Sequence, residues 1–381
     1  MRTITDEQKQ ALEDLSAEGL LRGLPIQTAE KDIHITELLR GLSTLEVHHE
    51  HFRPTSRRDE PRLKRDTDIH LVFVGGTCLS KAYGLINRMS EDIDIKVVMH
   101  PPAAALKKGG SDRARLKALH AAVARLLEEL GFPLVEQAEN PHIRNSHRYY
   151  LVDAGYRTAF DVMSSLRPVL KLELIQRQPL LPFERRQFGY LYEALADRPL
   201  STPVEFNCIS IAETLAEKVL SLLRRCADNW DGHQARRGKG KNEQNTNEGE
   251  QGRNSSIDPT LVRHIYDVAR IAETAPESIA SARAIFAPLV ERDREEFEGQ
   301  NPEFDEDPAG VLKRTLGAAR ANTWLRQQYE KVLMPLVYDN NPPSFSDSFA
   351  AFEKVAVDLI ATCESPEHPS PAASSRGLPS R

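Results

Sequence analysis

The stretch "GGTCLSKAYGLINRMSEDIDI", from Gly75 to Ile95, decides which fold the sequence predicts. It follows the apolar run "IHLVFV" at 69–74, which is typical of a buried strand that ends in a turn. Residues 77–84 indicate a short helix closed by a glycine, and "DIDIKVVM" at 92–99 alternates like a strand. Fourteen residues separate Thr77 from Asp92. That length predicts one helix and a return to the adjacent strand.

Two aspartates open the second of these strands. Alternate side chains of a strand point to one face, so Asp92 and Asp94 share a face. Hard carboxylate oxygens of this kind suit Mg²⁺, which also takes oxygens from substrate phosphates. In "LKLEL" at 170–174, Glu173 offers a third carboxylate on a plausible neighbouring strand, with Lys171 on the same face. Three carboxylates can hold two metal ions roughly 4 Å apart. Taken alone, however, such an aspartate pair is more often the solvated face of an edge strand.

The two glycines suggest a place for phosphate beside the carboxylates. Gly75 and Gly76 allow another group to approach the backbone closely, and Thr77 begins a helix whose N–H groups favour an anion. Lys81, one turn into that helix, can reach phosphate or solvent. A tight turn without a ligand is the commoner meaning of a glycine pair. The spacing to Asp92 favours the functional interpretation, because cradle and metal ligands would then face one cleft.

Composition narrows the class of protein. The 381 residues are 40% hydrophobic and 28% charged with a net charge of −6, which predicts a globular protein and argues against a uniformly basic nucleic-acid-binding surface. The four cysteines lie far apart, so neither a metal clip nor a disulfide framework is expected. The polar, acidic start does not resemble a targeting signal, and no apolar run approaches the about 18 residues of a membrane span. A cytoplasmic protein without a membrane partner is expected.

The pattern along the chain predicts an α+β fold. We expect a core at 69–205 that contains a small mixed β-sheet, preceded by N-terminal helices and a basic loop at 1–68. Further strands of that sheet are expected in the segments 147–154, 157–164 and 168–177.

From about residue 206 the pattern becomes helical. We expect an α-helical domain at 206–363, with a nearly apolar-free, flexible insertion at 232–256 that is either decoration or a basic arm for substrate. The segment 364–381 has the composition of a disordered tail.

Two charged residues of the helical domain are candidates for a cleft. Lys218 interrupts the apolar stripe of its helix, so it either extends to solvent or points its ammonium at nucleotide phosphate. Asp267 follows Arg263 by four residues, and the two can form an ion pair within one helix, worth about 0.3–0.5 kcal/mol. His264 can act in acid–base chemistry but more often makes a structural hydrogen bond.

A basic segment precedes the core. It is either a solvated loop or a contact for an RNA backbone, without aromatic residues for base stacking. Its members are Arg53, Arg57, Arg58, Arg62, Lys64 and Arg65.

The glycine–aspartate motif resembles the core motif of the AbiEii/AbiGii toxin family. It comprises Gly-Gly-Thr, a helix, Arg88, and Ser90 to Asp94. These proteins are nucleotidyltransferases of the polymerase-β-like superfamily, and they act as toxins in type IV toxin–antitoxin and phage-defence (abortive infection) systems. Other segments resemble the family in the same order, over roughly residues 25 to 362: "EKDIHITELL", "LKLEL", "AEKVLSLLRR", "RHIYDVARI", "LRQQYEKVLM" and "SFSDSFAAFEKV".

The resemblance implies a reaction and a set of site residues. It implies that NMP is transferred from NTP with Mg²⁺ or Mn²⁺, that a tRNA 3′ end is the acceptor, and that a cognate antitoxin controls the protein. The metal ligands implied are Asp92, Asp94 and Glu173. Lys218 and Asp267 join them as catalytic residues. The residues implied to contact the nucleotide are Gly75, Gly76, Thr77, Lys81, Arg88 and Ser90.

The sequence also allows two alternatives. The same cleft can modify a protein side chain or a small molecule such as an aminoglycoside. The fold can also bind nucleotide or antitoxin without chemistry, although all three carboxylates are present.

Overall fold

The computed structural model describes residues 1–51, 63–100, 110–137, 139–161, 166–199, 202–227, 258–339 and 341–364. The predicted insertion at 232–256 and the tail from 365 onward lie outside these ranges. The chain divides into two compact units. Unit 1 comprises Met1–Thr214 with Glu330–Ser344, and unit 2 comprises Leu215–Tyr329 with Phe345–Arg381.

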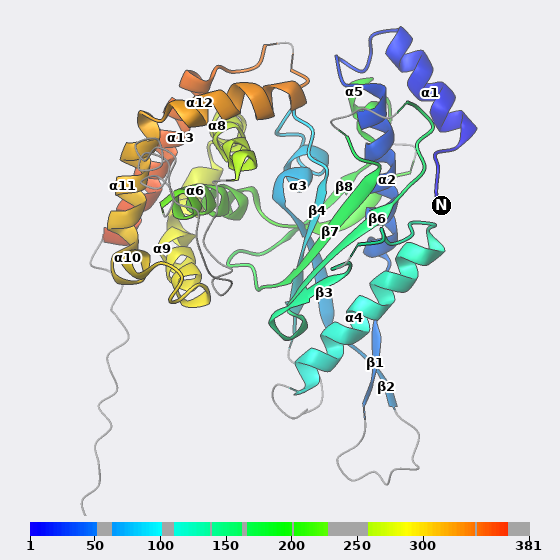
Figure 1. Ribbon diagram of the computed structural model, residues 1–381, viewed down its shortest axis with the longest axis horizontal. Coiled ribbons are helices and arrows are strands. Elements are labelled where there is room, and N and C mark those ends of the chain that lie inside the picture. The colour runs from blue at the N-terminus through cyan, green and yellow to red at the C-terminus, as the bar shows by residue number, and fades with distance from the viewer. Residues whose placement is uncertain are drawn as a thin grey trace, which may run out of the picture. The chain divides into compact units, whose positions relative to one another are not determined.

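Unit 1 is built on a mixed seven-stranded sheet, in agreement with the predicted fold class (Figure 1). Its strand order is β5-β6-β7-β4-β3-β9-β8. The pairs β4–β7 and β3–β9 are parallel, and the other neighbours are antiparallel. The strands are β3 (Ile69–Val74), β4 (Asp92–Met99), β5 (His142–Arg144), β6 (Tyr149–Gly155), β7 (Val169–Gln176), β8 (Glu184–Phe188) and β9 (Val204–Cys208).

Helices of unit 1 lie beside this sheet, and a separate two-stranded hairpin extends away from it (Figure 1). The hairpin pairs β1 (His48–His51) with β2 (Leu63–Asp66). The helices are α1 (Asp6–Ala17), α2 (Ile26–Ser43), α3 (Gly75–Lys81), α4 (Gly110–Glu129) and α5 (Leu191–Leu195), with short 3₁₀ helices η1 (Asn145–His147) and η4 (Met334–Leu336). Helix α1 begins with the predicted capping box between Thr5 and Gln8, which satisfies two backbone donors.

The main core lies between one face of the sheet and helices α2 and α4. Ile93 and Ile95 of β4 and Leu172 and Leu174 of β7 are at most 1% exposed and belong to this core. Apolar residues of α2 and α4 complete it, at positions such as Leu38. Because side chains alternate along a strand, the residues between these leave the core and line the other face. That other face carries Asp92, Asp94 and Glu173.

Several predicted boundaries differ from the structure. The expected strand at 157–164 is wrong over 157–161, where the backbone is irregular, and 162–165 lie outside the described residues. Helix α3 begins at Gly75 rather than Thr77, so both glycines belong to its first turn. The sequence pattern does not predict strands β8 and β9. Strand β9 pairs with β3, which is distant in sequence, and local pattern carries little information on such pairings.

Unit 2 is helical. Helix α6 (Ile211–Ala227) begins in unit 1 and continues into unit 2. Helices α8 and α13 form an extensive contact within unit 2. The elements that lie wholly in unit 2 are η2 (Pro259–Val262), α8 (Arg263–Thr274), α9 (Ser278–Glu296), α10 (Pro302–Glu306), α11 (Pro308–Arg320), α12 (Thr323–Gln328), α13 (Phe345–Ile360) and η5 (Ala361–Glu364). Element η3 (Tyr329–Leu333) starts at Tyr329 of unit 2 and otherwise belongs to unit 1. Among the helices described in both units, none combines the length and apolarity that crossing a membrane requires.

Candidate functional site

The register between β4 and β7 aligns the predicted carboxylates. Asp94 is the direct partner of Glu173, and Asp92 is the direct partner of Lys171. Partners in register lie side by side on one face of a sheet, about 5 Å apart. The Lys171 ammonium lies 4.0 Å from Asp92 Oδ1, which reduces the repulsion between neighbouring carboxylates. The structure therefore groups Asp92, Asp94 and Glu173 on the sheet face opposite the main core.

The glycine turn lies directly against this group. Val74, at the end of β3, is the register partner of Asp94, and the chain turns at Gly75 with φ +78°. A Cβ atom at Gly75 would lie 2.3 Å from Asp94 Oδ2. A Cβ atom at Gly76 would lie 2.7 Å from Arg88 Nη2. A Cβ atom at either glycine would thus displace the neighbouring carboxylate or guanidinium, and Gly75 also has a positive φ, which favours glycine.

A hydroxyl connects this turn to the start of β4. Thr77 Oγ1 donates to the Asp92 carbonyl and lies 2.9 Å from Ser90 Oγ. Arg88 is 3% exposed, and its Nη1 donates to the Met89 carbonyl at 3.0 Å. Thr77, Arg88 and Ser90 therefore lie together beside the glycines, as the sequence predicted for nucleotide-contacting residues. Whether they contact a nucleotide stays a prediction.

Lys81 has a structural partner. Its ammonium lies 2.6 Å from Asp32 Oδ1 and also donates to the Gly189 carbonyl, and the Lys81 side chain is 3% exposed. Contact with phosphate would require the ammonium to leave this buried pair. Nearby, Lys31 of α2 forms an ion pair with Glu91, the residue before β4. Asp32 and Lys31 of α2 therefore form ion pairs with α3 and with the residue just before β4.

Tyr149 is a site residue that the sequence did not single out. Its hydroxyl donates to Glu173 Oε2 at 3.2 Å. Burial, and then the Glu173 carboxylate, raise the pKa of Tyr149 to about 12, so the phenol keeps its proton at neutral pH. Period-two alternation in "HRYYLVDA" predicts that Tyr149 and the buried Tyr150 lie on opposite faces of the sheet. It does not predict that this strand lies next to the strand of Glu173.

Next to the carboxylates, the same face of the sheet carries a buried ion pair between Lys96 and Glu213. Lys96 follows Asp94 by two residues, and its ammonium lies 2.9 Å from Glu213 Oε1. The other oxygen of Glu213 accepts the backbone N–H groups of Leu180 and Leu181, each at 2.9 Å. Because both charges and the loop amides are satisfied, this end of the face is structural.

The carboxylate group fits a hard divalent cation. The ligands are oxygens, and the Asp92 side chain is 39% exposed, so solvent and substrate can reach it. Within the described residues, no group of three or more His, Cys, Asp or Glu side chains is placed so that all could hold one metal ion. That is compatible with Mg²⁺, which commonly uses one or two carboxylates and completes its shell with water and substrate phosphate.

In unit 2, Lys218 and Asp267 form an ion pair. Lys218 Nζ lies 2.7 Å from Asp267 Oδ2, with side chains 8% and 0% exposed. Asp267 therefore pairs across two helices, α6 and α8, and Lys218 does not extend freely into solvent. His264 Nδ1 lies 3.1 Å from the Lys218 carbonyl. Burial, and then the Lys218 ammonium, lower the pKa of His264 to about 3, so its imidazole is neutral at pH 7.

Two other predicted or visible features lie away from the carboxylates. The basic residues Arg53, Arg57, Arg58 and Arg62 lie outside the described residues, as do the side chains of Lys64 and Arg65.

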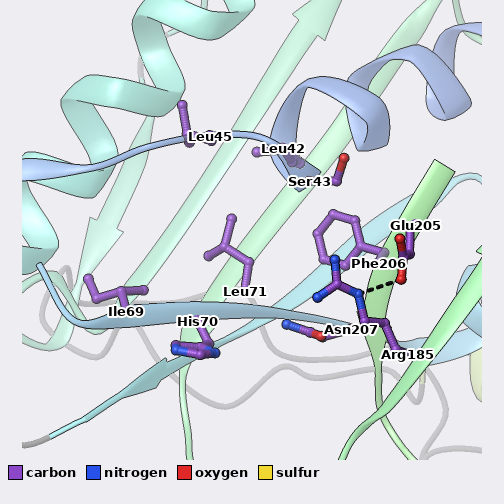
Figure 2. Close-up of a pocket in the computed structure, with 10 residues that line it drawn as sticks. All are labelled: Leu42, Ser43, Leu45, Ile69, His70, Leu71, Arg185, Glu205, Phe206 and Asn207. Carbon is purple, nitrogen blue, oxygen red and sulfur yellow. Dashed lines mark ion pairs between the residues drawn. The ribbon is translucent and has the colours of Figure 1, made fainter. Parts of the chain in front are cut away.

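A pocket of about 210 Å³ opens between the end of α2 and strands β3, β8 and β9, with an Arg185–Glu205 ion pair of 2.6 Å at its side (Figure 2). Its lining includes His70, four residues before Val74, and no predicted site residue.

Comparisons with known proteins place this chain among nucleotidyltransferase toxins. A family model described as "Nucleotidyl transferase AbiEii toxin, Type IV TA system" matches residues 62–351, about three quarters of the chain. Among solved structures, the chain is similar to MenT4, a nucleotidyltransferase toxin from Mycobacterium tuberculosis H37Rv. The identity is 16% over 95% of this chain and 94% of that chain, with a TM-score of 0.43. A comparison with curated proteins found no match.

Proposed function

Because this chain belongs to the AbiEii family of nucleotidyltransferase toxins from type IV toxin–antitoxin systems, we propose that it transfers NMP from NTP to RNA, at the 3′ end of a tRNA. The observation that supports this most directly is the register of Asp94 against Glu173, beside a backbone turn that only glycine permits. Such a site offers carboxylates and closely approachable backbone within one small region.

The residues divide between two tasks. Asp92, Asp94 and Glu173 would hold Mg²⁺ or Mn²⁺, which when bound supplies Lewis-acid activation and neutralises phosphate charge. Gly75 and Gly76 would contact the triphosphate through their backbone, next to Asp94 and Arg88, which lie close to these glycines. Thr77, Arg88 and Ser90 hold the shape of that turn and present polar groups next to it.

The transfer itself needs a hydroxyl to attack the α-phosphorus. A bond forms between the acceptor oxygen and phosphorus, and the bond to the pyrophosphate leaving group breaks. Glu173 takes the hydroxyl proton or orients the hydroxyl for attack, and Tyr149 holds the Glu173 carboxylate in place through its hydrogen bond. Lys218 and Asp267 remain proposed catalytic residues, Lys218 as a charge that stabilises the developing phosphate negative charge.

The biological setting follows from the toxin class. A type IV system implies a cognate antitoxin as partner and a growth-inhibiting activity in the toxin. Modification of tRNA 3′ ends would block aminoacylation in the cytoplasm and halt translation, which also suits phage defence.

Incubation with each labelled NTP, total tRNA and Mg²⁺ tests the proposal. We expect wild type to label tRNA, and Asp92→Ala and Glu173→Gln to lose about 10²–10⁴-fold in rate. Glu128→Gln, a change on the exposed side of α4, is the control and should keep full activity. Gel and thin-layer analysis separates labelled RNA from labelled protein or small molecules. Label in either of the latter would overturn the RNA assignment, and toxicity that survives Asp92→Ala would indicate a binding module.

A further inference from the structure

A second pocket of unit 1 adjoins the carboxylates. It has a volume of about 350 Å³, within the range of small-ligand sites. We infer that this pocket, called here the β5–β6 pocket, holds the terminal nucleoside of the RNA acceptor. This inference rests on the proposed function. The residues that line it are Gln137, Glu139, His142, Arg144, Tyr149 and Leu151.

Strand register fixes the position of the β5–β6 pocket relative to the proposed chemistry. Asp94 pairs with Glu173, Glu173 with Leu151, and Leu151 with His142. These four residues therefore form one row across β4, β7, β6 and β5, on one face of the sheet. Strand spacing puts His142 about 10 Å from Glu173. A nucleoside in the pocket can therefore place its sugar hydroxyl beside Glu173.

The order of the row also separates the two substrates. The glycine turn follows Val74, the partner of Asp94 on the β3 side of β4. The β5–β6 pocket lies on the other side of β4, beyond Glu173. A triphosphate at the glycine turn and an acceptor in the pocket would therefore approach the carboxylates from opposite sides, as attack on the α-phosphorus with departure of pyrophosphate requires.

The side chains of the pocket suit a nucleobase and ribose. The rings of His142 and Tyr149 meet edge to face, with centroids 6.0 Å apart. His142 Nδ1 lies 2.9 Å from Glu139 Oε2, which favours a proton on Nδ1. His142 Nε2 is buried and has no hydrogen-bond partner among the described residues, so it can accept from a base or sugar donor.

Charge argues against a polyphosphate in the same pocket. Among the described lining residues, Arg144 carries the permanent positive charge, and Glu139 carries a negative one. Gln137 Nε2 also donates to Asp153 Oδ2 at 2.9 Å, which adds a second carboxylate nearby. A neutral nucleoside with one phosphodiester near the exposed Arg144 matches this balance, whereas a triphosphate does not.

RNA binding by the full chain tests the inference without catalysis. The probe is a fluorescent single-stranded RNA with a free 3′ hydroxyl, titrated by anisotropy in EDTA without NTP. We expect His142→Ala and Arg144→Ala each to weaken binding about tenfold, a change of about 1.4 kcal/mol. Arg148→Ala removes the same charge from an exposed residue of the same turn that does not line the pocket, and should change binding less than about twofold.

Steady-state kinetics gives the second measurement. The two pocket variants should raise KM for RNA and leave KM for NTP unchanged. Equal weakening by Arg144→Ala and Arg148→Ala, or no effect of His142→Ala, would overturn the inference while wild-type labelling of RNA still upheld the proposed function. A raised KM for NTP instead would assign the pocket to the incoming nucleotide. A wild type that neither binds nor labels RNA would overturn both.

Discussion

Asp94 and Glu173 are direct register partners across the parallel strands β4 and β7, although 79 positions separate them in the sequence. Asp94 also meets the glycine turn, because Val74 is its partner on the other side. Asp94 therefore lies next to both Glu173 and the glycine turn. A shift of either strand by one residue would move its carboxylates to the core face. The packing of α2 and α4 against the apolar face therefore fixes the register that places Asp94 beside Glu173.

Replacement of Gly75 by alanine should abolish activity for a steric reason. The new Cβ would lie 2.3 Å from Asp94 Oδ2, so the carboxylate must move. Gly84→Ala is a matched control, because Gly84 also has positive φ, +63°, but a Cβ atom there would have no atom within 4 Å. Both variants should lose about 1–3 kcal/mol of unfolding free energy from backbone strain. Only Gly75→Ala should lose most nucleotidyl transfer, and equal loss in both would refute the steric explanation.

Tyr149→Phe tests whether the tyrosine positions Glu173. The variant keeps the ring and removes the hydroxyl that donates to Glu173 Oε2. We expect kcat to fall about tenfold, in line with about 1.4 kcal/mol for a hydrogen bond to a charged group. The acid limb of the pH–rate profile should move to higher pH, because a bond that stabilises the ionised carboxylate is lost. An unchanged profile would assign Tyr149 to packing. Tyr150→Phe, in the core beside it, is the control.

The Lys218–Asp267 pair allows stability to be separated from catalysis. Lys218→Met removes the ammonium that lies 2.7 Å from the buried Asp267 carboxylate and should cost about 3–5 kcal/mol of unfolding free energy in urea titrations. The double variant Lys218→Met/Asp267→Asn removes both charges and should recover most of that loss. If Lys218 acts on phosphate, the double variant should fold and still lack transfer activity. Restored activity in the double variant would instead make the pair purely structural.

Acid should destabilise the protein through its buried histidines. His34 is 0% exposed, both ring nitrogens lack partners among the described residues, and burial lowers its pKa from 6.5 to about 3. As pH falls below 6.5, His34 becomes protonated in the unfolded chain but stays neutral in the folded protein. The free energy of unfolding therefore decreases as the pH falls toward 3. Between about pH 6.5 and pH 5 this histidine should remove about 2 kcal/mol.

His34→Phe checks the source of this pH dependence. The ring lies between Phe132 and Tyr156, so an apolar ring fits the surroundings. Urea titrations at about pH 7 and pH 5 should show a smaller difference in unfolding free energy for the variant than for wild type. His70→Phe, at an exposed position, should leave the difference unchanged. An undiminished difference in His34→Phe would assign the acid sensitivity to other groups, such as His264.

Much of the core is predictable because its signals are local. Strand β4 runs from Asp92 to Met99 as the alternation indicates, and α4 ends just before Gly131, whose φ is +78°. Apolar residues of period two or 3.6 report directly which face is buried. The order of the family motifs adds the reaction type, which composition and periodicity cannot supply.

The partners of the charged residues are not predictable in the same way. The sequence favours phosphate or solvent as the surroundings of Lys81, but this lysine pairs with Asp32, 49 positions earlier. Helical spacing offers Arg263 as a partner for Asp267 but cannot indicate Lys218 of another helix, which pairs with Asp267. Such choices depend on which helix faces pack together, and sequence spacing carries information only about one helix at a time.

By itself, the sequence determined the family, the strand–helix–strand unit around Gly75, and the shared face of Asp92 and Asp94, because a strand's alternation is a property of its own backbone. Only the tertiary structure decided that Glu173 lies next to Asp94, that Tyr149 binds it, and that His142 ends the same row. Strand order and register arise from packing between segments distant in the chain, where the hydrophobic core selects one alignment among several that local pattern permits.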